Sequence, residues 1–293
     1  MTIAVIVGYA FGALAGWSFS RSERVAAVWR VVIRSQIVLV SVVVSLLAAW
    51  RLPSVADLLW PIVGGAIGII LVAVALVVTP RGEDRLGRAV LRGWSASPNG
   101  GFWAIPVATA VAGAGATVFA VLIDRVLVVI FGVMTWLLRR DAPLKQQRRT
   151  SWIDQAPVIA LVIGLVLNVL SDAPTWTASA LEWSAPLMAM AGAAVFVGSV
   201  LHPSQRIPWR PGIGPWVLLV GVRVAMFVPL ALIAPEMGMH VVFLLFAFSI
   251  PAFFPPQLSI LYGYRDPVVA AAVRWGWIFA PVGIAAAILA ARS

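Results

Sequence analysis

Long apolar stretches, separated by short polar segments, account for most of the 293-residue chain. A helix needs about 20 mostly apolar residues to cross the hydrocarbon core of a bilayer. The pattern contains ten such stretches, and we predict a membrane-spanning helix for each. The predicted spans are 2–19, 31–50, 58–78, 86–113 and 116–138 in the first half, and 156–170, 178–201, 214–234, 241–262 and 268–291 in the second.

Composition favours lipid as the surrounding solvent. Hydrophobic residues make up 62% of the chain and charged residues only 11%, whereas a soluble domain has roughly 25% charged residues. Little sequence remains between the spans for a separate soluble domain. Because cysteine is absent, disulfides, thiol catalysis and thiolate metal sites are excluded. We therefore expect a single all-α membrane bundle.

The distribution of charge predicts the orientation of the bundle. Each loop after an odd-numbered span is more basic than the loops after even-numbered spans, near which Asp57, Asp172, Glu182 and Glu236 lie. Basic loops stay in the cytoplasm, so we attribute the net charge of +10 to topology rather than to nucleic-acid binding. Both termini are then expected outside a plasma or inner membrane. Arginines follow the first stretch instead of preceding it, so we interpret that stretch as a span and not as a signal peptide.

The most basic loop, after the fifth span, divides the ten spans into two sets of five. Because five is odd, the second set enters the membrane in the opposite orientation, which is the arrangement of an inverted repeat. We predict one repeat over residues 1–150 and a second over residues 151–293. A proline precedes an arginine by 19 residues in both repeats, at 106–125 and at 255–274.

The fourth span of each predicted repeat is interrupted. Two prolines and two glycines lie between Ser97 and Pro106, and three prolines lie between Pro251 and Ser259. Proline removes a backbone donor and glycine tolerates dihedrals closed to other residues, so neither segment forms a regular helix. Such breaks are buried in protein or line a wet cavity. They bind solutes in many transporters, and a packing kink is the alternative.

The first break resembles a known motif. Residues 99–106, Asn-Gly-Gly-Phe-Trp-Ala-Ile-Pro, resemble the Asn-x-Gly-Phe-x-Gly-x-Pro pattern of the auxin efflux carrier family, with alanine at the second family glycine. Residues 251–252, 262–263 and 266–267 (Pro-Ala, Tyr-Gly and Asp-Pro) resemble a second stretch of that family. Residues 157–168 are similar to its sixth span.

The resemblance implies a scaffold of spans 1, 2, 6 and 7, through which a homodimer forms, and a moving transport unit of the other six. Spans 4 and 9 would cross at their breaks and bind a small organic anion such as auxin, malate or malonate. The candidate binding residues are Asn99, Gly100, Gly101, Pro106, Pro255, Pro256, Gln257 and Ser259. Phe254 and Pro255 stand where the family often has polar residues, which leaves the substrate and any coupling ion open.

Asn99 is the strongest of these candidates. Its amide both donates and accepts hydrogen bonds, which suits a carboxylate or a carboxylic acid. The alternative is that Asn99 caps the half-helix that begins after Pro98. The two roles are compatible.

Four charged residues lie deep within predicted spans: Asp124, Arg125, Arg223 and Arg274. Charge at such depth is costly and needs a partner in the protein interior. Neighbours in a helix point in different directions, so we expect Asp124 and Arg125 to be poor partners. Asp124 is instead expected to pair with Arg223 or Arg274 and to respond to protonation. A static ion pair, or an arginine that snorkels from a helix end, is the alternative.

Small residues recur every fourth position in the first span, at Gly8, Gly12 and Gly16. This spacing predicts close helix packing or a dimer contact rather than ligand binding. The two histidines, His202 and His240, are predicted on opposite sides of the membrane and are too few for a metal site. No cofactor is expected.

The leading functional hypothesis is a carrier that moves a small organic anion by alternating access, driven by protons, the membrane potential or a solute gradient. One alternative is a sensory or structural membrane subunit that keeps the fold without transport. The other is an intramembrane enzyme that acts on lipid, against which the scattering of the acidic residues argues. The sequence has no HExxH, Walker or Gly-x-Ser-x-Gly pattern, so we expect a protein that is not an enzyme.

Overall fold

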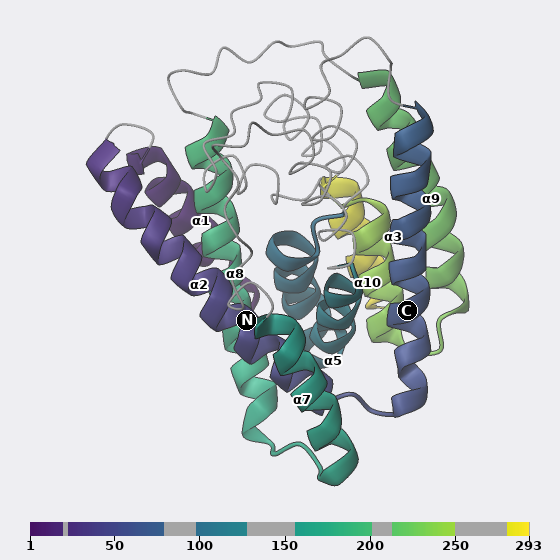
Figure 1. Cartoon of the computed structure of the whole chain (residues 1–293). Helices are drawn as coiled ribbons and strands as arrows, with labels where there is room; N and C mark the ends of the chain where they lie inside the picture. Colours follow the sequence, from purple (N-terminus) through teal and green to yellow (C-terminus); the bar gives the residue numbers. More distant parts are fainter. Residues whose placement is uncertain (20–22, 79–97, 128–155, 201–212, 250–279, 293) are drawn as a thin grey trace, which may run out of the picture.

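The computed structural model describes residues 1–19, 23–78, 98–127, 156–200, 213–249 and 280–292, and its regular structure there is helical throughout. The helices are α1 Thr2–Phe19, α2 Glu23–Trp50, α3 Leu59–Val78, α5 Ile105–Val126, α7 Ala156–Leu170, α8 Trp176–Val200, α9 Ile213–Ile233 and α10 Met237–Ala247. A further helix, Ala280–Ala290, lies at the C-terminus (Figure 1). The prediction of an all-α fold is confirmed for this part of the chain.

Most helix bounds agree with the apolar stretches. α1 and α7 have the predicted bounds, and α8 and α9 differ from them by one or two residues. α2 begins at Glu23 rather than at residue 31, because glutamate and arginine are good helix formers and a helix continues beyond its apolar part. The parts of the predicted spans within 79–97, 128–155, 201–212 and 250–279 lie outside the described residues.

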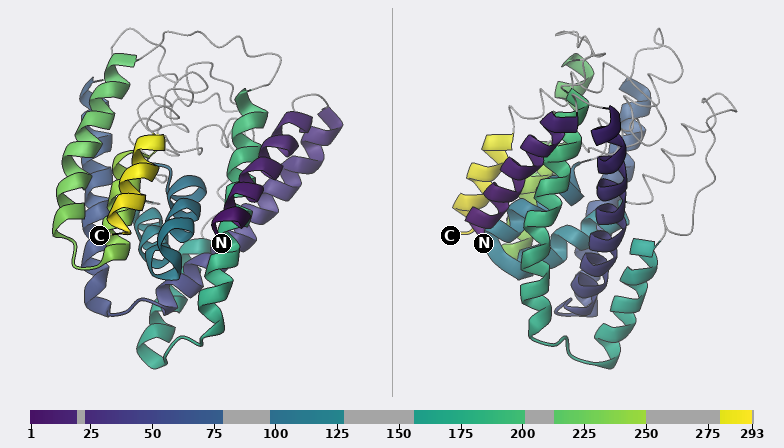
Figure 2. Two further views of the ribbon diagram at one scale, coloured as in Figure 1. Left: turned by 180° about the vertical axis from the view of Figure 1, so that it is seen from behind. Right: turned by 90° about the vertical axis from the view of Figure 1, so that its left-hand side faces the viewer.

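The helices pack as two groups with α5 between them, as both Figure 1 and Figure 2 show. In the first group α1 lies along α8, and α2 lies along α7. In the second group α9 contacts both α3 and α10. α5 contacts helices of both groups, chiefly α8 and α10.

Three glycines allow α1 to approach α8 closely. A Cβ atom at Gly8, Gly12 or Gly16 would overlap a backbone carbonyl oxygen of α8. The oxygens concerned belong to Pro186, Met190 and Ala194, one per helical turn. The close packing predicted from the glycine spacing is therefore confirmed, and it occurs within one chain.

A side chain of α7 forms hydrogen bonds with the backbone at the C-terminal end of α2. The Asn168 Nδ2 donates hydrogen bonds of 2.8 Å to the carbonyl oxygens of both Trp50 and Leu52. The indole Nε1 of Trp50 donates in turn to the carbonyl oxygen of Ser171 at 3.1 Å. The last carbonyl groups of a helix have no partner within it, so these bonds fix α2 against α7.

α5 folds back on itself at Gly113, which has φ 72° and ψ −161°. The hydroxyl oxygens of Thr109 and Thr117 lie 2.8 Å apart, whereas residues eight apart in an unbroken helix are separated by about 12 Å. Residues 105–112 and 114–126 are thus two arms joined by a sharp turn. This turn lies where the predicted fourth span ends.

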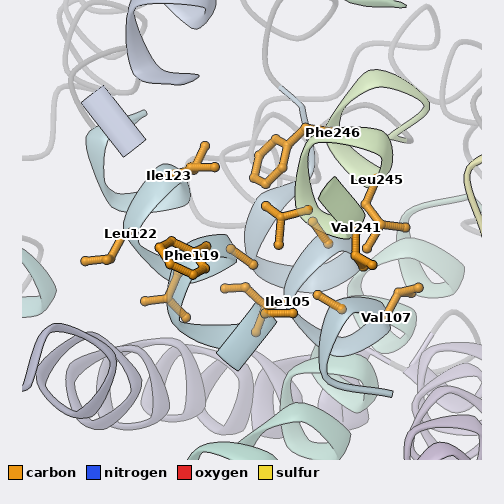
Figure 3. Close-up of a cluster of buried hydrophobic side chains, with 14 of the residues drawn as sticks. Ile105, Val107, Phe119, Leu122, Ile123, Val241, Leu245 and Phe246 are labelled. Carbon is orange, nitrogen blue, oxygen red and sulfur yellow. The ribbon is translucent and has the colours of Figure 1, made fainter. Parts of the chain in front are cut away.

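Apolar side chains from both arms of α5 and from α10 form the centre of the bundle (Figure 3). The labelled members of this cluster are Ile105, Val107, Phe119, Leu122, Ile123, Val241, Leu245 and Phe246. All of them are buried. The segment that precedes α5 is therefore held at the middle of the protein.

The outer faces of the helices are apolar too. Large apolar side chains at least 60% exposed include Ile3, Leu39, Leu59, Val169, Leu232 and Leu289. They belong to six different helices, whereas a water-soluble surface scatters such residues singly. Among the described residues, Gly100–Val126 and Trp176–Gly198 are long and apolar enough to cross a membrane, although the first bends at Gly113. Other described apolar stretches are shorter.

Three connections between consecutive helices lie towards the same end of the molecule (Figure 1). They join α2 to α3, α7 to α8, and α9 to α10. Each contains one of the acidic residues Asp57, Asp172 and Glu236.

Candidate functional site

The break before α5 comprises residues 98–104. Asn99 is its N-cap, and the side-chain Oδ1 accepts a hydrogen bond of 3.1 Å from the backbone N–H of Phe102. Gly100–Ala104 form one π-helical turn, and α5 begins at Ile105. Pro106 lies in the first turn of α5, a position at which proline is common. The prediction that this segment is not a regular α-helix is confirmed for residues 98–104, and so is the capping role of Asn99.

Ser249 joins this break to α9. Its Oγ accepts a hydrogen bond of 3.1 Å from Nη1 of Arg223 and one of 3.3 Å from the backbone N–H of Asn99. Arg223 is 0% exposed, Ser249 1% and Asn99 2%. The sequence did not single out Ser249, and the available signal was its position as the last polar residue before Pro251.

Three donors of this cluster have no hydrogen-bond partner among the described residues. They are Nδ2 of Asn99 and both Nε and Nη2 of Arg223. Buried donors are almost always partnered in proteins, and an unpartnered one is costly. In the described part of the chain, no carboxylate forms an ion pair with Arg223. The cluster thus combines a buried positive charge with open donors.

Asp124 lies against the glycines of the same break. A Cβ atom at Gly100 would overlap Oδ1 of Asp124, so this position needs the absence of a side chain. The backbone N–H of Gly101 donates a hydrogen bond to the carboxylate. The absence of a side chain at Gly100 therefore allows the backbone of the break to approach a buried carboxylate directly.

The prediction that Asp124 and Arg125 are poor partners is wrong. Nη1 of Arg125 lies 3.2 Å from Oδ2 of Asp124, and its Nε donates to Oγ of Ser45 on α2 at 2.8 Å. The two Cβ atoms do point in different directions, but the arginine side chain is long enough to fold back while Ser45 holds it. The expected pairing of Asp124 with Arg223 is not formed.

Side chains of the first helix group reach the break and the arm that follows it. The hydroxyl of Tyr9 on α1 donates to the carbonyl oxygen of Phe102 at 2.9 Å, and Oγ1 of Thr2 donates to the carbonyl oxygen of Ala110 at 3.0 Å. On α8, Gly192 faces the side chain of Phe102, against which a Cβ atom would clash. The break is therefore in contact with both groups of helices.

Several predicted site residues lie outside the described residues: Pro255, Pro256, Gln257, Ser259 and Arg274. The described part of the ninth predicted span is short, since α10 ends at Ala247, ahead of Pro251. Nε2 of His240 bonds to the carbonyl oxygen of Ala234 at 2.6 Å. Within the described ranges, no three histidine or acidic side chains are grouped as metal ligands.

The sequence matches no protein-family model and no curated protein.

Proposed function

We propose that this protein is a secondary transporter, similar to the auxin efflux carriers, that moves a small organic anion across a plasma or inner membrane by alternating access. The observation that carries the proposal is the buried helix break at residues 98–104. It lies between two packed helix groups, beside a buried arginine and open hydrogen-bond donors. The positive end of a helix and a buried guanidinium both favour an anionic solute.

Lipid is the proposed solvent for the outer faces of the helices. Trp176–Gly198 of α8 has 23 residues and is apolar enough to cross a hydrocarbon core that is about 30 Å thick. The exposed apolar side chains supply the matching surface. Ten spans with both termini outside remain part of the proposal, supported by the common end at which the acidic connections lie.

Reciprocal packing supports an inverted repeat. If the chain consists of two five-helix repeats, α1 and α2 of the first correspond to α7 and α8 of the second. α1 packs against α8, and α2 packs against α7. The first helix of each repeat therefore contacts the second helix of the other repeat. Such an exchange follows when a two-fold axis relates the two units. The contact between α3 and α9 fits the same axis.

The two helix groups support a division of the protein into a fixed scaffold and a moving transport unit. α1, α2, α7 and α8 would form the scaffold, and with it the surface of a homodimer, while α3, α5, α9 and α10 belong to the moving unit. The polar cluster around Asn99 is closed to solvent, as an occluded state of a carrier would be. Movement of one group against the other would open it to each side in turn.

Uptake into proteoliposomes tests the proposal. Purified protein is reconstituted and supplied with labelled malonate, malate or indole-3-acetate, with and without an imposed pH gradient. We compare wild type with Asn99→Ala and Asn99→Ser. Serine keeps a capping oxygen and removes only the amide, so it separates the solute-binding role from the structural one. Saturable uptake by wild type, with strong reduction in both variants, is the expected result.

Two outcomes of the uptake experiment would contradict the proposed function. If folded protein transports nothing from a broad panel of carboxylic acids, the proposal is wrong, and a sensory or structural membrane subunit takes its place. Release of products from the liposome lipids would point instead to an intramembrane enzyme.

A further inference from the structure

We infer that Arg223 binds one carboxylate group of the transported anion side-on, through its Nε and Nη2 atoms, and that Nδ2 of Asn99 is a third donor to the same group. This inference depends on the proposed function and assigns its binding residue and the class of ligand. The ligand is a carboxylic acid whose ionised carboxylate enters the protein at the helix break.

The geometry of the guanidinium group selects these atoms. Its N–H groups lie in one plane, and those of Nε and Nη2 leave the same edge in parallel. Two parallel donors match the two oxygens of a carboxylate. In this structure Nη1 is bound to Ser249, and the two unpartnered nitrogens are the two of that edge. Nε and Nη2 of Arg223 thus form a pair of parallel open donors, which we call the fork.

The charge balance points to an anion from outside the described chain. Arg223 is fully buried, and a buried charge without a counter-charge is strongly unfavourable. Asp124 is the one buried acidic side chain in the described ranges, and it is paired with Arg125 and with the backbone of Gly101. No described carboxylate therefore neutralises Arg223.

Asn99 is held in position to contribute. Its Oδ1 is fixed by the N–H of Phe102, and its backbone N–H by Ser249. Because the amide oxygen is fixed, the orientation of Nδ2 is fixed as well. Ser249 accepts hydrogen bonds from the backbone N–H of Asn99 and from Nη1 of Arg223 through one oxygen, so the two residues are neighbours. The cluster offers one positive charge and three nitrogen donors without a described partner, which suits one carboxylate.

Binding measurements with purified full-length protein in detergent test this assignment. The probes are benzoate and malonate, with benzamide and malonamide as neutral counterparts of the same shape. Arg223→Lys keeps the charge and removes the fork, and we expect it to weaken benzoate binding about tenfold to hundredfold. The matched control is Arg51→Lys, because Nη1 of Arg51 also bonds to a hydroxyl, that of Thr177, away from the break. Its benzoate affinity is expected to equal that of wild type.

Infrared difference spectra give a readout that does not depend on a variant. Wild-type protein with ¹³C-labelled arginine should show shifted guanidinium bands when benzoate binds, and no shift with benzamide. Absence of that shift, with benzoate bound, would overturn the inference even if Arg223 variants do not fold.

The outcomes separate the two proposals. If Arg223→Lys binds and transports carboxylates as wild type does, a carboxylate of the chain itself holds the fork, and only this inference is wrong. If wild type binds none of the probes and transports no carboxylic acid, the proposed function fails with it.

Discussion

The hydroxyl of Tyr9 on α1 donates a hydrogen bond of 2.9 Å to the carbonyl oxygen of Phe102, inside the helix break. Tyr9 belongs to the first helix group, and Phe102 lies in the turn that precedes α5. A carbonyl within one π-helical turn lies at an irregular point of the backbone, where side chains commonly complete the hydrogen bonding. This bond therefore attaches the break to α1.

Replacement of Tyr9 by phenylalanine removes this bond and keeps the ring. We expect a loss of about 1 kcal/mol in the free energy of unfolding, the usual net value of one hydrogen bond. Thermal unfolding in detergent measures it. Ser18→Ala is the matched control, since among the described residues its hydroxyl bonds to the Ala15 carbonyl within α1, and it should change little. Equal midpoints for the two variants would show that the Tyr9 bond does not hold the break.

The α1–α8 contact predicts a steric effect at Gly12. In Gly12→Ala the new Cβ would meet the backbone oxygen of Met190, and overpacking of this kind costs about 1–3 kcal/mol. Gly221→Ala on α9 is the control, because a Cβ there meets nothing within 4 Å and alanine favours helix by roughly 0.5–1 kcal/mol. The unfolding midpoint should fall for the first variant and hold or rise for the second. The packing account fails if both behave alike.

The turn within α5 predicts a backbone effect at Gly113. Its φ of 72° and ψ of −161° belong to a region that only glycine adopts without strain, at a cost of about 1–3 kcal/mol for other residues. Gly113→Ala should therefore lower the unfolding midpoint. Gly115→Ala, two residues away with open space around it, should not. A similar decrease in both variants would mean that the turn is not sharp in solution.

The sequence was sufficient to locate several helices and the first break. α1 and α7 have the predicted bounds because each is apolar along most of its length and is followed directly by a polar residue. Proline and glycine located the break at residues 98–104 because their effect on the backbone is local. Helix bounds and helix breaks were therefore predictable, because both depend on the local sequence.

Contacts between distant segments were not predictable in the same way. The glycines of α1 indicated close packing but not that the partner is α8. The role of Ser249 depends on the end of α10 meeting Asn99, which lies 150 residues earlier. The pairing of Asp124 with Arg125 depends on the rotamer of Arg125, and Ser45 on another helix fixes that rotamer. Such relationships are decided by tertiary packing rather than by local pattern.

Asp124 and Arg125 provide the last prediction, because their ion pair separates a structural role from a proton-relay role. Both side chains are at most 10% exposed, and removal of one partner from a buried pair costs about 3–5 kcal/mol. Asp124→Asn should lower the unfolding midpoint strongly, and Arg125→Met should do the same. The double variant should lose less than the sum of the two, since it leaves no charge unpaired. Asp172→Asn, at an exposed site, is the control.

Uptake by the same Asp124→Asn protein decides the functional question. Because the carboxylate is already bound by Arg125 and by the backbone of Gly101, we expect a structural ion pair. Uptake per folded molecule should then keep the pH dependence of wild type. If the variant folds and transports but no longer responds to an imposed pH gradient, Asp124 is a proton-relay group, and the structural interpretation is wrong.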